Sequence, residues 1–436
     1  MNRRTFIQSA VATGAASAAF SKIQFAHAQG EAKFKIALIG SGWWGMNILR
    51  EAIAAGRGPV VALCDADTNL LSTNAAEVEK LSGNKPKTYK DFREMLAVEK
   101  PGIVIVATPD HWHALNAIAA LKAGAHVYLE KPISHTINEG KAIVNAAREN
   151  GRVVQIGTHR RASAHNISAQ QFLREGKAGE IGLVRSFVHY GGGPGQKQNP
   201  VEPPAGLDWN LYCGPAQLMP YYQGIHQRGW RNYLNFSNGQ LGDWGIHWLD
   251  QILWWSGQTT GEVAPRRVFS TMSRQIRTDH TDIPDTQIAT YEFENFTATW
   301  EHRLYADNKA EKHNIGCYFY GTRGTLHLGW LDGWTFYPSN GRDPIIHEDA
   351  KLNKPDEQNI KELWVDFLKA IDSGSKPISN IESGHRSTTM ALLGMLSGKI
   401  GRSVNWDGQK ELIVGDKEAN RLLSRPYRAP WKYPEG

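Results

Sequence analysis

The chain has 436 residues, a formal net charge of +6 and only three cysteines, at positions 64, 213 and 317. This length is too great for one compact core and predicts two domains. The cysteines are too far apart for a disulfide scaffold or a set of metal ligands, and no Lys/Arg run resembles a nucleic-acid-binding arm, so we expect neither a structural metal nor a nucleic-acid partner.

The first 28 residues have the three parts of an export signal. Arg3 and Arg4 form a twin-arginine pair, residues 10–20 are apolar or small, and Ala26-His27-Ala28 offers a cleavage site. The apolar stretch is too short to span a membrane, and no later run is long enough. We therefore predict a signal peptide over residues 1–28, twin-arginine export of the folded protein to the periplasm, and a mature form without a membrane segment.

A dinucleotide-binding pattern follows the signal. Residues 34–39 form an apolar strand that ends in a Gly-x-Gly-x-x-Gly turn, and a helix, the strand at 60–64 and Asp65 come next. The glycines permit a tight turn and a close approach of the pyrophosphate to the helix N-terminus, and the acid would bond the ribose hydroxyls. Asp65 would repel a 2′-phosphate, so NAD is favoured over NADP. The predicted cofactor contacts here are Gly40, Gly42, Trp43, Trp44, Gly45 and Asp65.

Strands and helices continue to alternate up to residue 157. Strands are predicted at 103–107, 126–129 and 152–157, with helices at 114–123 and 136–150 between them. This alternation predicts a doubly wound parallel sheet in a domain of residues 33–157. Ligands bind at the carboxyl ends of such strands, so the loops at 40–45, 108–113 and 130–132 should line one crevice.

Lys131 directly follows one of these buried strands. A lysine is costly to bury, so this one should lie at the rim of the crevice, and Pro132 restricts its backbone to extended conformations. On these residues alone, an ordinary charged strand end is the favoured interpretation.

The pattern changes in residues 158–436. Strands at 181–190, 263–277, 286–294, 297–304, 315–320, 325–328 and 334–337 are mostly joined by hairpin-length links, which predicts antiparallel pairing. We expect a large, mostly antiparallel open sheet, flanked by helices on one face and free for a subunit partner on the other. Residues 191–235 form a loop-rich, aromatic insertion. The fold class is therefore α/β followed by α+β.

A candidate acid–base cluster lies on a predicted helix over residues 239–255. Asp243 and His247 are four residues apart, and Asp250 is three beyond His247, so either carboxylate could hold the imidazole as a general base. The alternative is an aspartate favoured by the helix dipole beside a hydrogen-bonded core histidine.

Other polar residues give weaker signals. His111 and His113 are expected on a loop and have no third ligand nearby, so no metal site is predicted. His159, Arg160 and Arg161 follow the last parallel strand and are expected to contact the cofactor or substrate, or to be solvated at the rim.

Together these motifs resemble the Gfo/Idh/MocA oxidoreductases. The resemblance covers essentially the whole mature chain and rests on Gly40-x-Gly42-x-x-Gly45, Asp65, Thr108-Pro109 with His113, Glu130-Lys131-Pro132, and Asp243-x-x-x-His247-x-x-Asp250. It implies a Rossmann domain followed by a domain with a large sheet that mediates assembly into homodimers or homotetramers. It also implies that Thr108, Pro109, His113, Glu130 and Lys131 contact the cofactor.

The resemblance further implies hydride transfer between NAD and a carbon of a sugar or polyol. Lys131 and His247 would flank the reacting hydroxyl, Asp243 would bind substrate, and His247 would take the hydroxyl proton. The predicted catalytic residues are Lys131, His247 and Asp243, with Arg161, Trp230 and Arg231 as further substrate contacts.

Export restricts the choice of reaction, because free NAD is scarce outside the cytoplasm and a bound cofactor must be recycled in place. The main interpretation is an oxidoreductase that passes hydride between sugars, favoured by the intact Lys131 and His247. An alternative is an NAD-dependent glycosidase or lyase that oxidises its sugar transiently. A lesser alternative is a non-catalytic sugar-nucleotide sensor.

Overall fold

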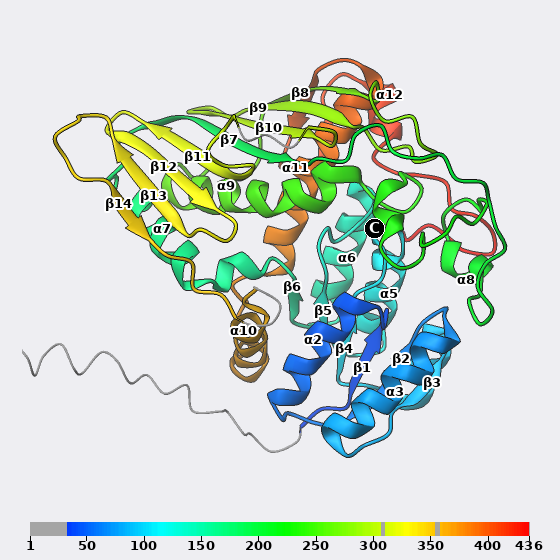
Figure 1. Ribbon diagram of the computed structural model, residues 1–436. Coiled ribbons are helices and arrows are strands. Elements are labelled where there is room, and N and C mark those ends of the chain that lie inside the picture. Colours follow the sequence, from blue (N-terminus) through cyan, green and yellow to red (C-terminus); the bar gives the residue numbers. More distant parts are fainter. Residues whose placement is uncertain (1–32, 307–309, 354–357, 436) are drawn as a thin grey trace, which may run out of the picture.

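The computed structural model describes residues 33–306, 310–353 and 358–435 (Figure 1). The predicted signal peptide lies outside these residues. The described residues form two sheets, a six-stranded one in the N-terminal part and a ten-stranded one in the C-terminal part. Within the described ranges, no helix is both long and apolar enough to cross a membrane.

The N-terminal sheet is parallel throughout, in the order β3-β2-β1-β4-β5-β6. Its strands are β1 (Ile36–Ile39), β2 (Val60–Cys64), β3 (Lys87–Tyr89), β4 (Ile103–Val106), β5 (His126–Leu129) and β6 (Val154–Ile156). Its helices are α2 (Trp43–Ala54), α3 (Thr68–Ser82), α4 (Phe92–Glu99), α5 (Asp110–Lys122) and α6 (Ile137–Glu149). Helices cover both faces, so β1 and β4 are apolar and buried at every position. The predicted doubly wound parallel sheet is confirmed.

Helix caps explain where several of these helices begin. The Asp67 carboxylate accepts hydrogen bonds from backbone amides at the start of α3, and Asp91 does the same for α4. Thr136 and Glu139 form a capping box at the start of α6. Helix α5 begins at Asp110, directly after Pro109, so the prediction of a loop over residues 108–113 was wrong at His111 and His113, which lie in a helical turn.

The C-terminal sheet has the order β14-β13-β12-β11-β7-β10-β9-β8-β15-β16. Its strands are β7 (Ile181–His189), β8 (Arg267–Ser273), β9 (Thr286–Glu292), β10 (Thr297–Arg303), β11 (Ile315–Gly321), β12 (Gly324–Gly329), β13 (Trp334–Pro338), β14 (Ile346–Glu348), β15 (Val404–Asp407) and β16 (Leu412–Ile413). All neighbours pair antiparallel except β7 and β10, which are parallel. The mostly antiparallel sheet is thus as predicted.

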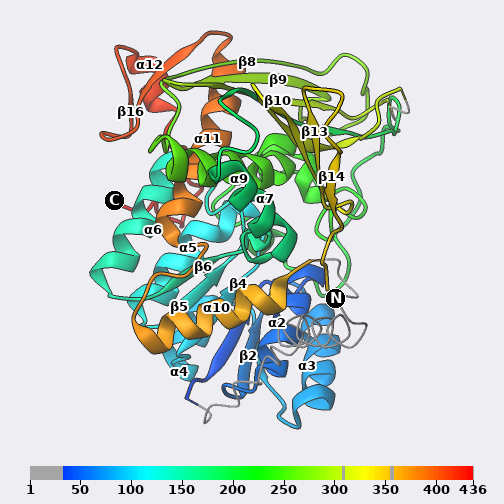
Figure 2. The same cartoon turned by 90° about the vertical axis from the view of Figure 1, so that its left-hand side faces the viewer.

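Helices pack on one face of this sheet (Figures 1 and 2). They are α7 (Ala164–Arg174), α9 (Ile246–Thr259) and α11 (Ile381–Ile400), with the short α12 (Lys417–Arg421) near β16. A π-helical turn, η3 (Leu241–Gly245), leads into α9 and interrupts the single α-helix that the sequence predicts. The predicted insertion contains the short α8 (Trp209–Cys213) and the 3-10 helix η2 (Gly229–Asn232).

One late helix returns to the N-terminal domain. Helix α10 (Ile360–Ser373) lies against α2 (Figures 1 and 2), and its Trp364 and Phe367 are fully buried in the same core as Ile36 and Leu38. Thus the core of the cofactor domain includes residues from beyond its predicted boundary at residue 157.

Candidate active site

A cavity of about 430 Å³ lies between the carboxyl ends of the parallel strands, the insertion and the start of α9. This volume is typical of a small-molecule site. Its lining includes nearly all of the residues predicted from the sequence. Those present are Gly40, Gly42, Trp43, Trp44, Asp65, Thr108, Pro109, Glu130, Lys131, Trp230, Arg231, Asp243 and His247.

The glycine turn between β1 and α2 has space for a ligand on one side and none on the other. Gly40 has φ +90°, and a Cβ there would lie 2.6 Å from the Ala107 backbone. A Cβ on Gly45 would lie 2.1 Å from the Gly40 carbonyl oxygen, so Gly45 packs behind the turn and does not line the cavity. At Gly42 a Cβ would meet nothing within 4 Å, and this residue is the N-cap of α2 and provides no side-chain hydrogen bond to the helix. The amides of the first helical turn are therefore available to an anion.

Asp65 lies at the end of β2, beside this turn. Its Oδ2 accepts hydrogen bonds from the Ser41 amide at 2.7 Å and the Ser41 hydroxyl at 3.1 Å, and Oδ1 accepts from the Asp67 amide at 3.1 Å. Burial raises the pKa of this carboxyl, while the hydrogen bonds oppose that shift. The acid is thus fixed at the edge of the cavity where the fingerprint predicts it.

His113 connects two loops of the crevice from behind the lining. Its Nδ1 lies 2.6 Å from the Pro132 carbonyl oxygen and its Nε2 lies 2.8 Å from that of Thr108. Burial lowers the pKa of His113 to about 4, so the ring is neutral and donates to one of the two carbonyls. His111 contacts a different partner, the Tyr212 carbonyl, at 3.0 Å. The two histidines therefore do not converge on one site.

Lys131 and Asp243 form an ion pair inside the cavity. Lys131 Nζ lies 2.9 Å from Asp243 Oδ1 and 2.8 Å from its backbone oxygen. Arg231, from the insertion, places its Nε 3.4 Å from Asp243 Oδ2. Burial alone would raise the pKa of Asp243, but the two cations outweigh it and lower that pKa to about 2. Asp243 is therefore ionised and holds both cations in place.

Two further carboxyls in the cavity have raised pKa values. Burial raises the pKa of Glu130 to about 7, although Lys131 opposes it. Burial, with the Asp243 charge, also raises the pKa of Asp110 to about 7, and Asp110 Oδ2 accepts a hydrogen bond from the Asn238 amide at 3.2 Å. The cavity therefore contains two carboxyls with raised pKa values, Glu130 and Asp110, and one, Asp243, whose pKa is lowered.

His247 faces the cavity without the carboxylate partner expected from the sequence. Its Nδ1 is buried and has no hydrogen-bond partner among the described residues. Asp243 pairs with Lys131 instead, because the π-helical turn changes the i, i+4 register. Burial, followed by the charge of Lys131, lowers the pKa of His247 well below its usual value, so the imidazole is neutral and can accept a proton.

Arg161 does not line the cavity, although the sequence suggested a substrate contact. Its Nε and Nη2 lie 2.7 and 2.9 Å from the carboxylate oxygens of Asp250, which also accepts from the Ser387 hydroxyl at 2.8 Å. The Arg161 and Asp250 side chains are 8% and 1% exposed. This buried pair holds the 3-10 helix η1 (His159–Ala162) against α9.

The structure adds site residues that sequence reasoning missed. Trp330, from the turn between β12 and β13, places its ring 5.0 Å from that of His247 and under the Arg160 guanidinium at 3.9 Å. No local pattern marks Trp330, because only the fold brings it to α9. His159 was a candidate from its position after β6, and its ring lies 5.3 Å from that of His247.

The insertion is fastened to the cofactor domain beside Asp65. The amide of Thr68 donates to Gly206 at 3.0 Å, and the Asp208 amide donates to Ala66 at 2.9 Å. Arg228 lies over the Trp43 ring at 4.2 Å. The insertion therefore forms a wall of the cavity along the cofactor residues.

Comparison with known proteins agrees with this arrangement. Residues 34–158 match the model of the oxidoreductase family NAD-binding Rossmann fold, and residues 182–433 match that of the C-terminal alpha/beta domain of the same family. The chain is 29% identical to a glycosyl hydrolase family 109 protein of Stenotrophomonas maltophilia over 85% of this chain and 75% of that protein. Several other curated relatives, among them an inositol 2-dehydrogenase of Salmonella typhimurium, match over less than half of their own length.

Two solved structures share the fold. An aldose-aldose oxidoreductase from Caulobacter crescentus, complexed with glycerol, is 21% identical with a TM-score of 0.64, covering 86% of this chain and 99% of that one. A levoglucosan dehydrogenase in complex with NADH and levoglucosan is 20% identical with a TM-score of 0.64, covering 85% and 98%. With both domain models matched in order, the chain belongs to the Gfo/Idh/MocA oxidoreductase family, with an NAD-binding Rossmann domain and a C-terminal alpha/beta domain.

Proposed function

We propose that the protein is an NAD-dependent glycosidase, which oxidises one hydroxyl of a bound glycoside transiently and reduces it again after the aglycone has left. The observation that carries the proposal is the placement of Lys131, Asp243 and His247 in the same cavity as the dinucleotide-binding turn. Similarity to the glycosyl hydrolase family 109 protein over most of both chains favours glycoside cleavage over net oxidation.

The residues around the glycine turn fit NAD. The open side of Gly42 and the uncapped amides of α2 suit a pyrophosphate, and Asp65 suits ribose hydroxyls while opposing a 2′-phosphate. Bound there, NAD would accept a hydride from a sugar carbon and return it later in the same cycle. The insertion beside Asp65 supports retention of the cofactor between cycles.

Lys131 and His247 have complementary tasks in the oxidation step. Two of the three Lys131 donors point to Asp243, which leaves one for the reacting sugar oxygen. The ammonium charge stabilises the developing alkoxide and so lowers the pKa of the hydroxyl, which matches it to the weakly basic neutral imidazole of His247. His247 takes the hydroxyl proton as the carbon loses hydride.

Cleavage follows from the carbonyl formed in this step. The C–H bond on the neighbouring carbon becomes acidic, and Lys131 and Arg231 stabilise the enolate that forms when its proton is removed. The bond to the aglycone oxygen then breaks, and that oxygen takes up a proton. We assign removal of the C–H proton to His159, which lines the same cavity, and the protonated imidazole then gives a proton to the departing aglycone oxygen. Addition of water across the new double bond and reduction of the carbonyl complete a net hydrolysis.

Solvent isotope exchange tests this sequence. The purified holoenzyme is incubated in D2O with a panel of nitrophenyl glycosides, and the released sugar is analysed by mass spectrometry and NMR. The expected result is nitrophenol release, deuterium on the carbon next to the oxidised one, and no net NADH at steady state. Release of nitrophenol without deuterium, or no release from any glycoside, contradicts the proposal.

A second candidate is net hydride transfer between sugars. The same placement of Lys131 and His247 favours it, because these groups serve the oxidation step in either reaction. The assay distinguishes the two: an oxidoreductase accumulates NADH, or reduces an added aldose, while the glycosidic bond stays intact.

We also propose that the protein is exported to the periplasm with NAD bound. The support is the Arg3-Arg4 pair, the apolar stretch behind it and the Ala-His-Ala site. A fusion of the first 28 residues to a reporter should reach the periplasm only in cells with a working twin-arginine system.

Finally, we propose that the protein forms a homo-oligomer through the outer face of the ten-stranded sheet. Leu183, Phe269 and Ile288 are exposed there on β7, β8 and β9. Light scattering after gel filtration should give a multiple of the chain mass, and Phe269→Glu should lower it.

A further inference from the structure

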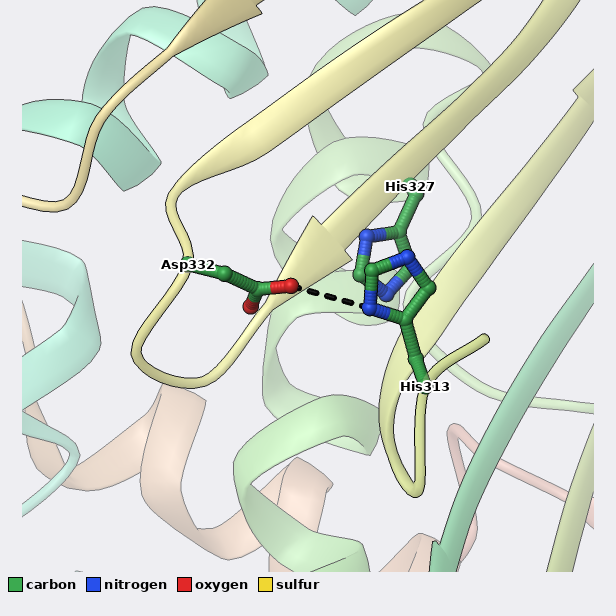
Figure 3. Close-up of side chains that lie close together, drawn as sticks. All are labelled: His313, His327 and Asp332. Atoms are coloured by element: carbon green, nitrogen blue, oxygen red, sulfur yellow. Dashed lines mark ion pairs between the residues drawn. The ribbon is translucent and has the colours of Figure 1, made fainter. Parts of the chain in front are cut away.

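Three side chains with metal-ligating atoms lie close together apart from the cavity, as Figure 3 shows. His313 lies just before β11, His327 lies within β12, and Asp332 lies in the turn between β12 and β13. The His313 Nδ1 and Asp332 Oδ2 atoms are 2.9 Å apart, and the two imidazole rings stack at 3.7 Å between centroids. One ligand atom from each residue lies within 4.8 Å of the other two.

Two nitrogens of this cluster are buried without partners. His327 is 1% exposed, and its Nε2 has no hydrogen-bond partner among the described residues; the same holds for His313 Nε2. Leaving such an atom unsatisfied is unfavourable, so a ligand that pairs with it would be stabilised. A Cβ on Gly316 would lie 2.5 Å from His327 Nε2, so only glycine at that position leaves space beside the nitrogen.

We propose that His313, His327 and Asp332 bind one divalent transition-metal ion of the zinc class. Two imidazoles and one carboxylate are ligands that zinc prefers, whereas calcium and magnesium prefer oxygen alone. The carboxylate of Asp332 exchanges its contact with His313 for the metal, and the fourth position is left to water.

One short turn links the proposed metal site to the cavity of the candidate active site. The turn that holds Asp332 also holds Trp330, whose ring contacts His247 and Arg160. A metal ion on Asp332 would therefore fix the turn and keep the indole against the imidazole. Metal binding itself does not depend on the proposed glycosidase reaction.

Zinc titration of the metal-free full-length protein tests the site. Isothermal titration calorimetry and elemental analysis after gel filtration should give one zinc per chain. Asp332 is 48% exposed, so Asp332→Asn should fold normally and weaken zinc binding by about 100-fold or more. His327→Gln should do the same, and its thermal unfolding shows whether it is folded. If His327→Gln is not folded, the zinc affinity of Asp332→Asn alone tests the site.

Asp349→Asn is the matched control. His347 lies in β14 and Asp349 directly follows that strand, and their side chains make a similar His–carboxylate contact of 3.1 Å. This pair belongs to no three-ligand group among the described residues. This variant should bind zinc like the wild type. Cobalt added in place of zinc should give visible absorption bands in the wild type and Asp349→Asn but not in Asp332→Asn. No zinc retained by the wild type, or equal affinity in Asp332→Asn, overturns the proposal.

Discussion

Replacing Arg161 with methionine separates a structural role from a substrate contact. The two hydrogen bonds to Asp250 are 2.7 and 2.9 Å long, and the Asp250 side chain is 1% exposed. Without Arg161, this buried carboxylate keeps the Ser387 hydroxyl as its hydrogen-bond partner. Removing one partner of such a pair costs roughly 3–5 kcal/mol. With an unfolding entropy of about 2.1 cal/mol/K per residue over roughly 400 residues, the melting temperature should fall by about 4–6 °C.

Urea unfolding and calorimetry measure this loss, and steady-state kinetics accompany it. Because Arg161 does not line the cavity, KM should change less than about twofold. Adding Asp250→Asn removes the unpaired charge and should restore part of the stability. Arg266→Met is the control, because its pair with Glu294 is exposed and should contribute less than about 1 kcal/mol. A tenfold rise in KM with an unchanged free energy of unfolding would refute the reasoning and would indicate that Arg161 contacts the substrate.

Three further predictions concern the cavity. Lys131→Met should lower kcat by about 10²–10³-fold, since it removes charge from the developing alkoxide, while NAD binding measured by calorimetry persists; near-wild-type kcat contradicts its role. Asp65→Ala should lower the ratio of the Kd for NADP to the Kd for NAD, because the carboxylate no longer repels the 2′-phosphate. If this ratio is unchanged, Asp65 does not contact the ribose. Folding raises the pKa of Asp110 from 3.8 to about 7, so between these values the folded state binds more protons than the unfolded state. The free energy of unfolding should therefore fall as pH rises from 4 to 7, by roughly 4 kcal/mol at most from this group. In Asp110→Asn the unfolding free energy should vary less between pH 5 and 8, and an identical slope would exclude this carboxyl as its source.

The sequence predicted the parallel sheet well because its signals are local. Strands β1, β2, β4 and β5 are short apolar runs, and each was placed within two residues of its observed bounds. Glycine or a charged residue directly follows β1, β2 and β5, whereas β4 runs into Thr108-Pro109. Helix α3 and strand β3 were not identified, because α3 is rich in Asn, Ser and Thr and β3 has only three residues. Propensity gives a weak signal for such elements.

The site was predictable where one segment carries the motif and not where distant segments meet. Glycine spacing identified the cofactor turn, and the residue pattern identified Lys131 and His247. The pairing of Asp243 with Lys131, and not with His247, depended on a π-helical turn that spacing could not show. Trp330 comes from a turn far along the chain, so its contact with His247 depends on the pairing of β12 with β13.

The return of α10 to the Rossmann core determines when that domain can mature during synthesis. Trp364 and Phe367 are fully buried against strands made much earlier, so those strands expose an apolar face until α10 has left the ribosome. Roughly 200 residues separate β6 from α10, which is a wait of about 10–40 s at 5–20 residues per second. Chaperone binding should therefore concentrate on nascent chains that end before residue 360, and a fragment cut at residue 157 should aggregate.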